Sequence, residues 1–357
     1  MRLRLYRFTC CAVALGLAAV ARSAAPDPKL FPVRQDGKWG YIDVRGKVVI
    51  PPHFDGAGPF SEGLASVKEG ARLGYVDATG ALVLVPSHDP AGLLHRPFSC
   101  GLAAIKHGGR IGFMDRSGAL AVPATFLAAK DFSEGFAFAC NGEACGFVDA
   151  AGKFVGSPMF MGGASFRNGF GTVILAMGMA HRRTSFVTTE RRRLADVYEG
   201  SGDFSEGLAP VRVGGRWGYV DATGKPVIRN AFDDAGRFAE GLAPVTLFET
   251  GRCGYVDRSG RLAIPARFAA CHPFSDGRAR VDLSERALDG ERVAFIDRDG
   301  KVIVAGASAE PRFDAAGDFE SGLAAVGVGG PPDFADDGSA KLGYVDTAGR
   351  YVWPPTN

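Results

Sequence analysis

The chain has 357 residues, of which 41 are Lys or Arg and 39 are Asp or Glu, so its formal net charge is +2. Apolar residues make up 46% of the chain, enough for a packed core, which excludes an intrinsically disordered protein. The 50 Gly and 21 Pro residues indicate a fold with many turns.

The first 25 residues have the pattern of a secretory signal peptide. Arg2, Arg4 and Arg7 precede an apolar run, Phe8–Ala21, and small residues follow this run. The run is short for a bilayer-spanning helix, which favours a cleaved segment over a membrane anchor. We therefore expect residues 1–25 to be removed.

Cleavage changes the charge and predicts the compartment. The favoured cut follows Ser23, with Ala21 at the −3 position. Loss of the segment removes four arginines and leaves 37 basic against 39 acidic residues, a net charge of about −2. We expect a periplasmic or secreted protein, residues 26–357, with no remaining transmembrane segment. Its near-neutral charge gives no reason to expect a nucleic acid as partner.

A five-residue pattern of the type WGYVD recurs along the mature chain and indicates a repeat protein. Clear copies begin at Trp39, Leu73, Ile111, Cys145, Trp217, Cys253, Val293 and Leu342. A second pattern, FSEGLA, begins at Phe60, Phe98, Phe132, Phe166, Phe204, Phe238, Phe274 and Phe319. A degenerate ninth copy, SFVT, occupies residues 185–188. One supersecondary unit per copy gives an array of about nine units over residues 26–357.

The unit can be read strand by strand. Residues 208–213 and 216–221 predict two strands joined by a two-glycine turn, so Arg212 should face Trp217. The following D-x-x-G sequence is typical of a type I turn, and residues 225–228 predict a third strand. Each repeat should therefore be a three-stranded meander.

The KWGYID and RWGYVD cores at residues 38–43 and 216–221, each followed by D-x-x-G, resemble the bacterial WG-repeat family, also called the KWG or WG β-repeat family. The resemblance extends from about Phe31 to Trp353. It implies an all-β array, commonly exported, without shared catalytic residues. The family's variable copy number favours an open superhelical stack. A closed propeller-like ring is the alternative, since closure hides the edges of both ends.

Five cysteines remain after cleavage, and export permits disulfides. With Gly142 and Glu143 as a two-residue turn, Cys140 and Cys145 face each other across a hairpin, within disulfide reach. We predict this bond. Cys253 with Cys271 is a second pairing, which would leave Cys100 free.

The recurrent acidic and aromatic residues have structural interpretations. The Asp of WGYVD begins the D-x-x-G turn, and the Glu of FSEGLA is interpreted as a loop cap. Trp39, Trp217 and the Tyr or Phe two residues after them are interpreted as packing between repeats. An exposed ladder of these rings would instead be typical of a carbohydrate-binding surface.

No metal, cofactor or catalytic motif is expected. His88, Asp89 and His95 come nearest to a metal-ligand spacing, and the acidic loop with Asp333, Asp336 and Asp337 lacks a calcium-binding pattern. The chain contains no G-x-S-x-G, Walker or H-E-x-x-H sequence. We therefore expect a protein that is not an enzyme.

The fifth repeat, at about residues 156–200, is degenerate. Its FSEGLA site has become FRNGFG and its WGYVD site SFVT. Because its D-x-x-G sequence is absent, we expect the turn to be lost as well. It carries the densest positive cluster of the mature chain, which consists of Arg182, Arg183, Arg191, Arg192 and Arg193. One interpretation is drift with a solvated charge run. The other is a binding surface for phosphate or carboxylate groups.

These observations favour an exported, non-catalytic repeat scaffold that binds a protein or an anionic cell-envelope polymer. A purely structural envelope component is one alternative. A hydrolase acting on a polymer is another, because catalytic residues can lie far apart in sequence.

Overall fold

The structure of the chain is a computed structural model that describes residues 29–86, 96–177, 181–194, 196–283, 293–305, 313, 315–328 and 341–356. Every regular element in these ranges is a β-strand, as the sequence predicts. Three predicted features lie outside the described residues. They are the signal peptide, the group of His88, Asp89 and His95, and the acidic loop with Asp333, Asp336 and Asp337.

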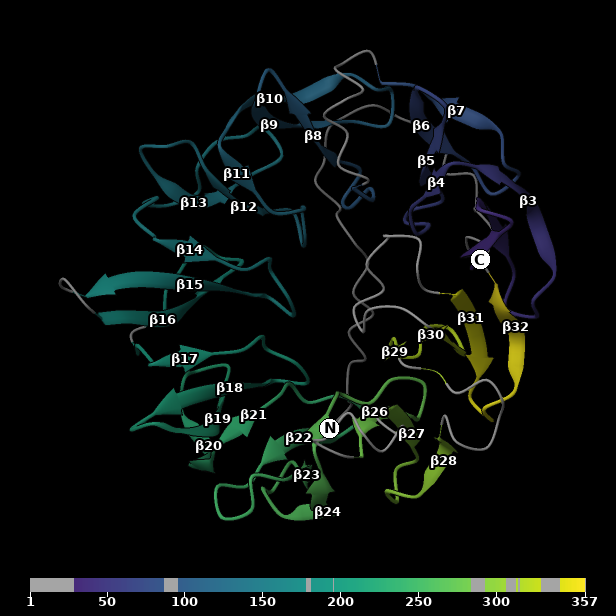
Figure 1. Cartoon of the computed structure of the whole chain (residues 1–357). Coiled ribbons are helices and arrows are strands. Elements are labelled where there is room, and N and C mark those ends of the chain that lie inside the picture. Colours follow the sequence, from purple (N-terminus) through teal and green to yellow (C-terminus); the bar gives the residue numbers. More distant parts are fainter. Residues whose placement is uncertain are drawn as a thin grey trace, which may run out of the picture.

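The described strands form nine small antiparallel sheets that follow one another around a ring (Figure 1). We number the sheets blades 1 to 9 in chain order. Blades 1 to 3 contain β1 (Phe31–Gln35), β2 (Lys38–Ile42), β3 (Val48–Phe54); β4 (Gly56–Ala57), β5 (Ala65–Glu69), β6 (Arg72–Val76), β7 (Leu82–Leu84); β8 (Ala103–His107), β9 (Arg110–Met114), β10 (Leu120–Phe126). Blades 4 to 6 contain β11 (Ala128–Ala129), β12 (Ala137–Cys140), β13 (Cys145–Val148); β14 (Gly162–Gly163), β15 (Phe170–Met177), β16 (His181–Thr188); β17 (Gly200–Ser201), β18 (Leu208–Val213), β19 (Arg216–Asp221), β20 (Pro226–Phe232). Blades 7 to 9 contain β21 (Asp234–Ala235), β22 (Leu242–Thr246), β23 (Cys253–Asp257), β24 (Leu262–Phe268); β25 (Ala270–Cys271), β26 (Ala279–Asp282), β27 (Val293–Ile296), β28 (Val302–Ala305); β29 (Ala315–Ala316), β30 (Leu323–Val328), β31 (Lys341–Asp346), β32 (Tyr351–Thr356).

The ring is closed, so the expected open superhelical array is wrong and the alternative, a propeller-like ring, is correct. Blade 9 packs against blade 1, where the Tyr344 hydroxyl donates to the Pro32 carbonyl at 2.9 Å and the Tyr344 ring meets Phe31 edge to face (Figure 1). Four other junctions, those that follow blades 1, 2, 6 and 7, use the same contact, as where Tyr41 donates to the Gly58 carbonyl at 2.8 Å. The last blade therefore meets the first through an ordinary junction, and neither leaves a sheet face exposed.

Aromatic pairs fill the junctions between blades. In blades 1 to 8 the Tyr or Phe of the WGYVD position meets the Phe of the next FSEGLA copy edge to face, with ring centroids 4.6–5.0 Å apart. Such pairs add about 0.5–1.5 kcal/mol each beyond the burial of their area. The predicted packing between repeats is confirmed for these rings. Trp39 and Trp217 are half-buried against the same clusters.

Most blades contain a short strand that the sequence did not predict. In five four-stranded sheets a two-residue strand lies at the inner end, as β29 does in Figure 1. The predicted three-stranded meander corresponds to the other three strands. Two residues are too few to show a period of two, so the strand left no pattern. The last strand of a four-stranded blade, such as β20 in blade 6, is its outer strand. Blades 4 and 5 have the inner strand but no regular outer strand.

The Gly of WGYVD lets the outer strand cross closely over the strand before it. A Cβ on Gly218 would lie 2.6 Å from the Ile228 carbonyl oxygen and 2.8 Å from the Asn230 nitrogen, both in β20. Blade 5 has Ser185 at this position, and it is buried. Its hydroxyl donates to the carbonyls of Leu194 and Asp196, at 3.1 and 2.9 Å. The side chain therefore occupies the space over which the outer strand crosses in other blades.

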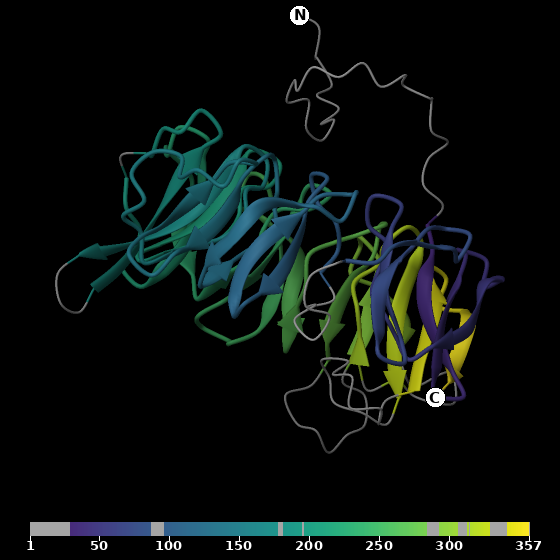
Figure 2. The ribbon, with the colours of Figure 1, turned by 90° about the horizontal axis from the view of Figure 1, so that it is seen from above.

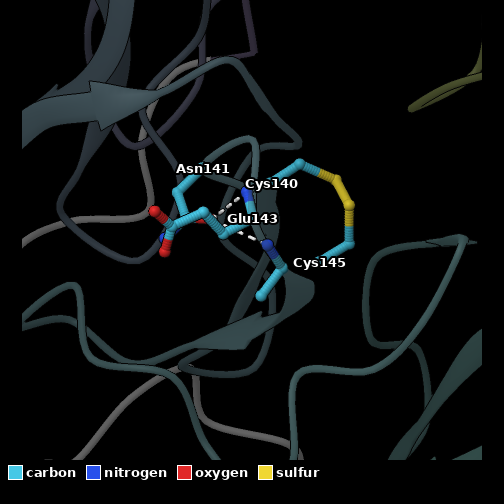
Figure 3. Close-up of a disulfide and its surroundings, with 5 residues drawn as sticks. Cys140, Asn141, Glu143 and Cys145 are labelled. Carbon is cyan, nitrogen blue, oxygen red and sulfur yellow. Dashed lines mark hydrogen bonds between the residues drawn. A yellow bond between two sulfur atoms is a disulfide. The ribbon is translucent and has the colours of Figure 1, made fainter.

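The hairpin register and the cysteine pairing follow the predictions. Arg212 faces Trp217, and Cys140 faces Cys145. The structure contains the Cys140–Cys145 disulfide, with the two Cα atoms 4.1 Å apart, at the end of the blade 4 hairpin (Figure 3). A second disulfide, Cys253–Cys271, joins blade 7 to blade 8, and Cys100 is free.

Candidate functional site

The Asp of WGYVD closes the turn that follows it. In blade 6 the Asp221 carboxylate accepts hydrogen bonds from the Thr223 hydroxyl and from the amides of Thr223 and Lys225, at 2.6, 2.8 and 3.1 Å. These hydrogen bonds hold the pKa of Asp221 below its ordinary value. The turns of Asp43, Asp77, Asp115, Asp149, Asp257, Asp297 and Asp346 have the same carboxylate-to-amide bonds.

The Glu of FSEGLA connects one blade to the next. Glu62 has a φ of 52°, a left-handed conformation, and its carboxylate accepts the amide of Gly101 in the following blade at 3.0 Å. Equivalent bonds join Glu134 to Gly169, Glu206 to Gly241, Glu240 to Gly277 and Asp276 to Gly322. The interpretation of this Glu as a cap is correct, but the loop it caps belongs to the neighbouring blade. The recurrent Asp thus stabilises a turn within its blade, and the recurrent Glu joins neighbouring blades.

No three His, Cys, Asp or Glu side chains in the described part of the chain lie close enough to hold a metal ion. No helix within the described ranges is long and apolar enough to cross a membrane.

Blade 5 keeps the geometry of the D-x-x-G turn although the sequence has lost it. The Arg191 amide donates to the Thr188 carbonyl at 2.8 Å, and the Thr188 amide donates to the Arg192 carbonyl at 2.9 Å, as in the other blades. Arg191 occupies the glycine position with a φ of 70°, where the eight glycines have φ values of 75–88°. The expectation that this turn had disappeared is therefore wrong, because main-chain bonds suffice to form it.

The five arginines of blade 5 do not form one cluster. Arg182 and Arg183 pair with Ala176 and Leu175 near the tip of the β15–β16 hairpin, which projects from the ring (Figures 1 and 2). Arg191, Arg192 and Arg193 follow the other end of β16. At roughly 3.3 Å per residue, the distance along β16 from Arg183 to Thr188 is already about 16 Å. The predicted single cluster is corrected to two groups, because β16 is eight residues long and fully extended.

The two groups differ in their charge partners. Arg183 forms an ion pair with Glu199 at 3.5 Å, and Glu199 also accepts the amides of Gly214 and Gly215. The side chains of Arg191, Arg192 and Arg193 are exposed, and none has an ion pair among the described residues. The second group, called the Arg191–193 turn below, therefore keeps its full charge for an external anion.

A groove of about 340 Å³ lies beside this turn, between blades 4 and 5. Blade 4 contributes β13 and the segment after it, and blade 5 contributes β15, β16 and the Arg191–193 turn. The lining residues are Phe147, Val155, Gly156, Ser157, Met159, Phe160, Leu175, Val187, Arg191 and Arg193. Arg192 is not among them. The groove forms where both blades lack a regular outer strand.

The sequence reasoning missed the apolar part of this site. Met159 and Met161 are 82% and 54% exposed, unusual for methionine. A compositional signal existed, because four of the six methionines of the chain lie between residues 159 and 179. The prediction for the degenerate repeat considered its arginines and not its methionines.

Comparisons with known proteins identify the repeat. The model of the WG containing repeat matches six segments, residues 39–71, 111–143, 197–217, 217–247, 254–284 and 294–330. Residues 144–196, which include blade 5, are outside the matches. None of the curated proteins compared with the chain matches it.

Solved structures show only a distant likeness. Dihydro-heme d1 dehydrogenase NirN in complex with DHE is 14% identical with a TM-score of 0.45, covering 96% of this chain and 76% of its own. AztD of Citrobacter koseri is 13% identical with a TM-score of 0.40, covering 90% and 92%. Hsv2p of Kluyveromyces lactis is 11% identical with a TM-score of 0.37, covering 61% and 73%. Scores this low bear on neither the activity nor the ligand of this chain. The repeat matches extend over about half of the chain, and the protein belongs to the WG-repeat family.

Proposed function

We propose that this protein is an exported, non-catalytic scaffold whose ring presents the Arg191–193 turn to an anionic cell-envelope polymer or an acidic protein. The observation that carries the proposal is a group of three exposed arginines without ion-pair partners among the described residues. They belong to the blade that departs most from the repeat. Guanidinium groups bind carboxylates and phosphates in bidentate geometry, which suits such partners.

Two further observations support the proposal. The Asp of WGYVD and the Glu of FSEGLA, where the repeats have them, are engaged in turns and in junctions between blades, which favours binding over acid–base catalysis. The two disulfides are consistent with an oxidising compartment outside the cytoplasm, such as the periplasm or the cell exterior.

The test compares two variants with the same change in charge. Arg191, Arg192 and Arg193 are replaced by Ser together, and in the control the exposed hairpin residues Lys68, Arg72 and Lys106 are replaced by Ser. Retention on immobilised heparin, a polyanionic glycan, is measured as the salt concentration of elution. We expect only the first variant to elute at clearly lower salt, with the melting temperature unchanged. Equal elution of both variants would remove the Arg191–193 turn as the binding surface.

A further inference from the structure

The groove between blades 4 and 5 combines apolar walls with two cations. Six of its ten lining residues are apolar, and Phe147 and Val187 at its base are almost fully buried. Arg191 and Arg193 line the same groove and have no ion pair among the described residues. Its volume of about 340 Å³ falls in the range of small-molecule sites.

The backbone at Arg191 gives an independent indication of function. A residue with a side chain is strained at a φ of 70°, and eight blades have glycine at this position. Blade 5 instead retains an arginine there, and that arginine lines the groove. Strain retained at one position of a repeat is the pattern expected of a residue kept for what its side chain binds.

We propose that this groove binds a free single-chain acyl carboxylate, that is, a fatty-acid anion. The guanidinium groups of Arg191 and Arg193 bind the carboxylate, and the chain lies along Phe160, Leu175 and Met159. A small inorganic anion would leave the apolar walls unused, and a neutral chain would leave both cations unpaired. Methionine adapts its shape to an apolar ligand, which suits an exposed wall that the ligand covers.

This inference rests on the proposed function only in that both use Arg191 and Arg193. A polymer bound by surface charge would use Arg192 to the same extent as its neighbours. A ligand inside the groove would not, because Arg192 does not line it.

The experiment is calorimetric titration of the full mature chain with decanoate at pH 7, beside decanol and acetate as probes that lack the charge or the chain. Of these three probes we expect only decanoate to bind measurably. Octanoate should bind more weakly than decanoate, by about fourfold for each methylene removed. Arg193→Ser and Arg191→Gly should each weaken binding about tenfold. Arg191→Gly should also raise the melting temperature, because glycine removes the strain.

Matched variants separate the groove from its surroundings. Arg192→Ser removes the same charge one residue away and should leave decanoate binding unchanged. Met159→Ala shortens a groove wall and should weaken binding, whereas Met161→Ala, exposed but outside the groove, should not. Absence of decanoate binding overturns the inference, and so does equal weakening by Arg192→Ser and Arg193→Ser.

The two proposals fail in different ways. Loss of decanoate binding in Arg193→Ser, together with unchanged heparin retention of the triple variant, would refute the polymer surface and support the groove. Heparin retention that falls equally with Arg192→Ser and Arg193→Ser, without any decanoate binding, would refute the groove and support the polymer surface.

Discussion

The replacement Gly218→Ala tests why the WG glycine recurs. The added Cβ would lie 2.6 Å from the Ile228 carbonyl oxygen, about 0.8 Å closer than the 3.4 Å of ordinary contact, and all its near neighbours are main-chain atoms. Overpacking of this kind costs about 1–3 kcal/mol. The lower entropy of alanine in the unfolded chain offsets roughly 0.4–1 kcal/mol of that cost. We therefore expect the free energy of unfolding to fall by about 1–2 kcal/mol.

Hydrogen exchange should show which strands Gly218→Ala destabilises. In Gly218→Ala the amides of β20 should lose protection while those of blade 8 keep it, because the outer strand must move away from β19. Ser185→Ala places the same residue at the equivalent position of blade 5. It should cost only the two hydroxyl hydrogen bonds, about 1 kcal/mol, without a change in neighbouring outer strands. Urea denaturation that shows less than about 0.5 kcal/mol of destabilisation in Gly218→Ala, with β20 still protected, would refute the steric argument.

Three further predictions concern pH, ring closure and the disulfide. The pKa values of five turn aspartates, Asp77, Asp115, Asp221, Asp257 and Asp346, lie below the ordinary value of 3.8, so their contribution to stability is complete above that pH and is lost as the pH falls through the folded-state values; urea titrations at pH 7 and pH 3 should show the loss, and equal stability at both would contradict it. Tyr344→Phe removes the donor to the Pro32 carbonyl and should destabilise the chain by about 1–3 kcal/mol and lengthen the distance between spin labels on blades 1 and 9; an unchanged distance would show that packing alone closes the ring. The Cys140–Cys145 bond closes only a short loop, so its reduction should lower stability by roughly 2 kcal/mol or less in thermal denaturation, and a much larger loss would mean that the bond does more than restrain the hairpin.

Local features could be predicted because turn length fixes the pairing. A two-residue turn at Gly214 sets Arg212 opposite Trp217, and the same count places Cys140 opposite Cys145. All-β content followed from the strands and turns that each repeat predicts. These are relations between residues close in sequence, which one chain records directly.

Closure of the ring could not be predicted in the same way. It depends on the angle between adjacent blades, which the packing of pairs such as Tyr41 with Phe60 determines, and no spacing encodes that angle. The prediction of a single arginine cluster was wrong because it did not take the length of β16 into account. The retained turn at Arg191 was missed because its bonds are made by the main chain, which is the same for every residue.

The junction between Tyr344 and Pro32 uses the contact found at four other junctions of the ring, so the packing does not depend on where the chain is cut. A circularly permuted chain that began at another blade, with the present ends joined by a linker, would form the same nine junctions. The position of the chain ends is therefore a matter of connectivity alone. In the natural order the first and last strands, β1 and β32, lie at one junction, and a domain joined through either strand would be carried at the same point on the ring (Figure 2).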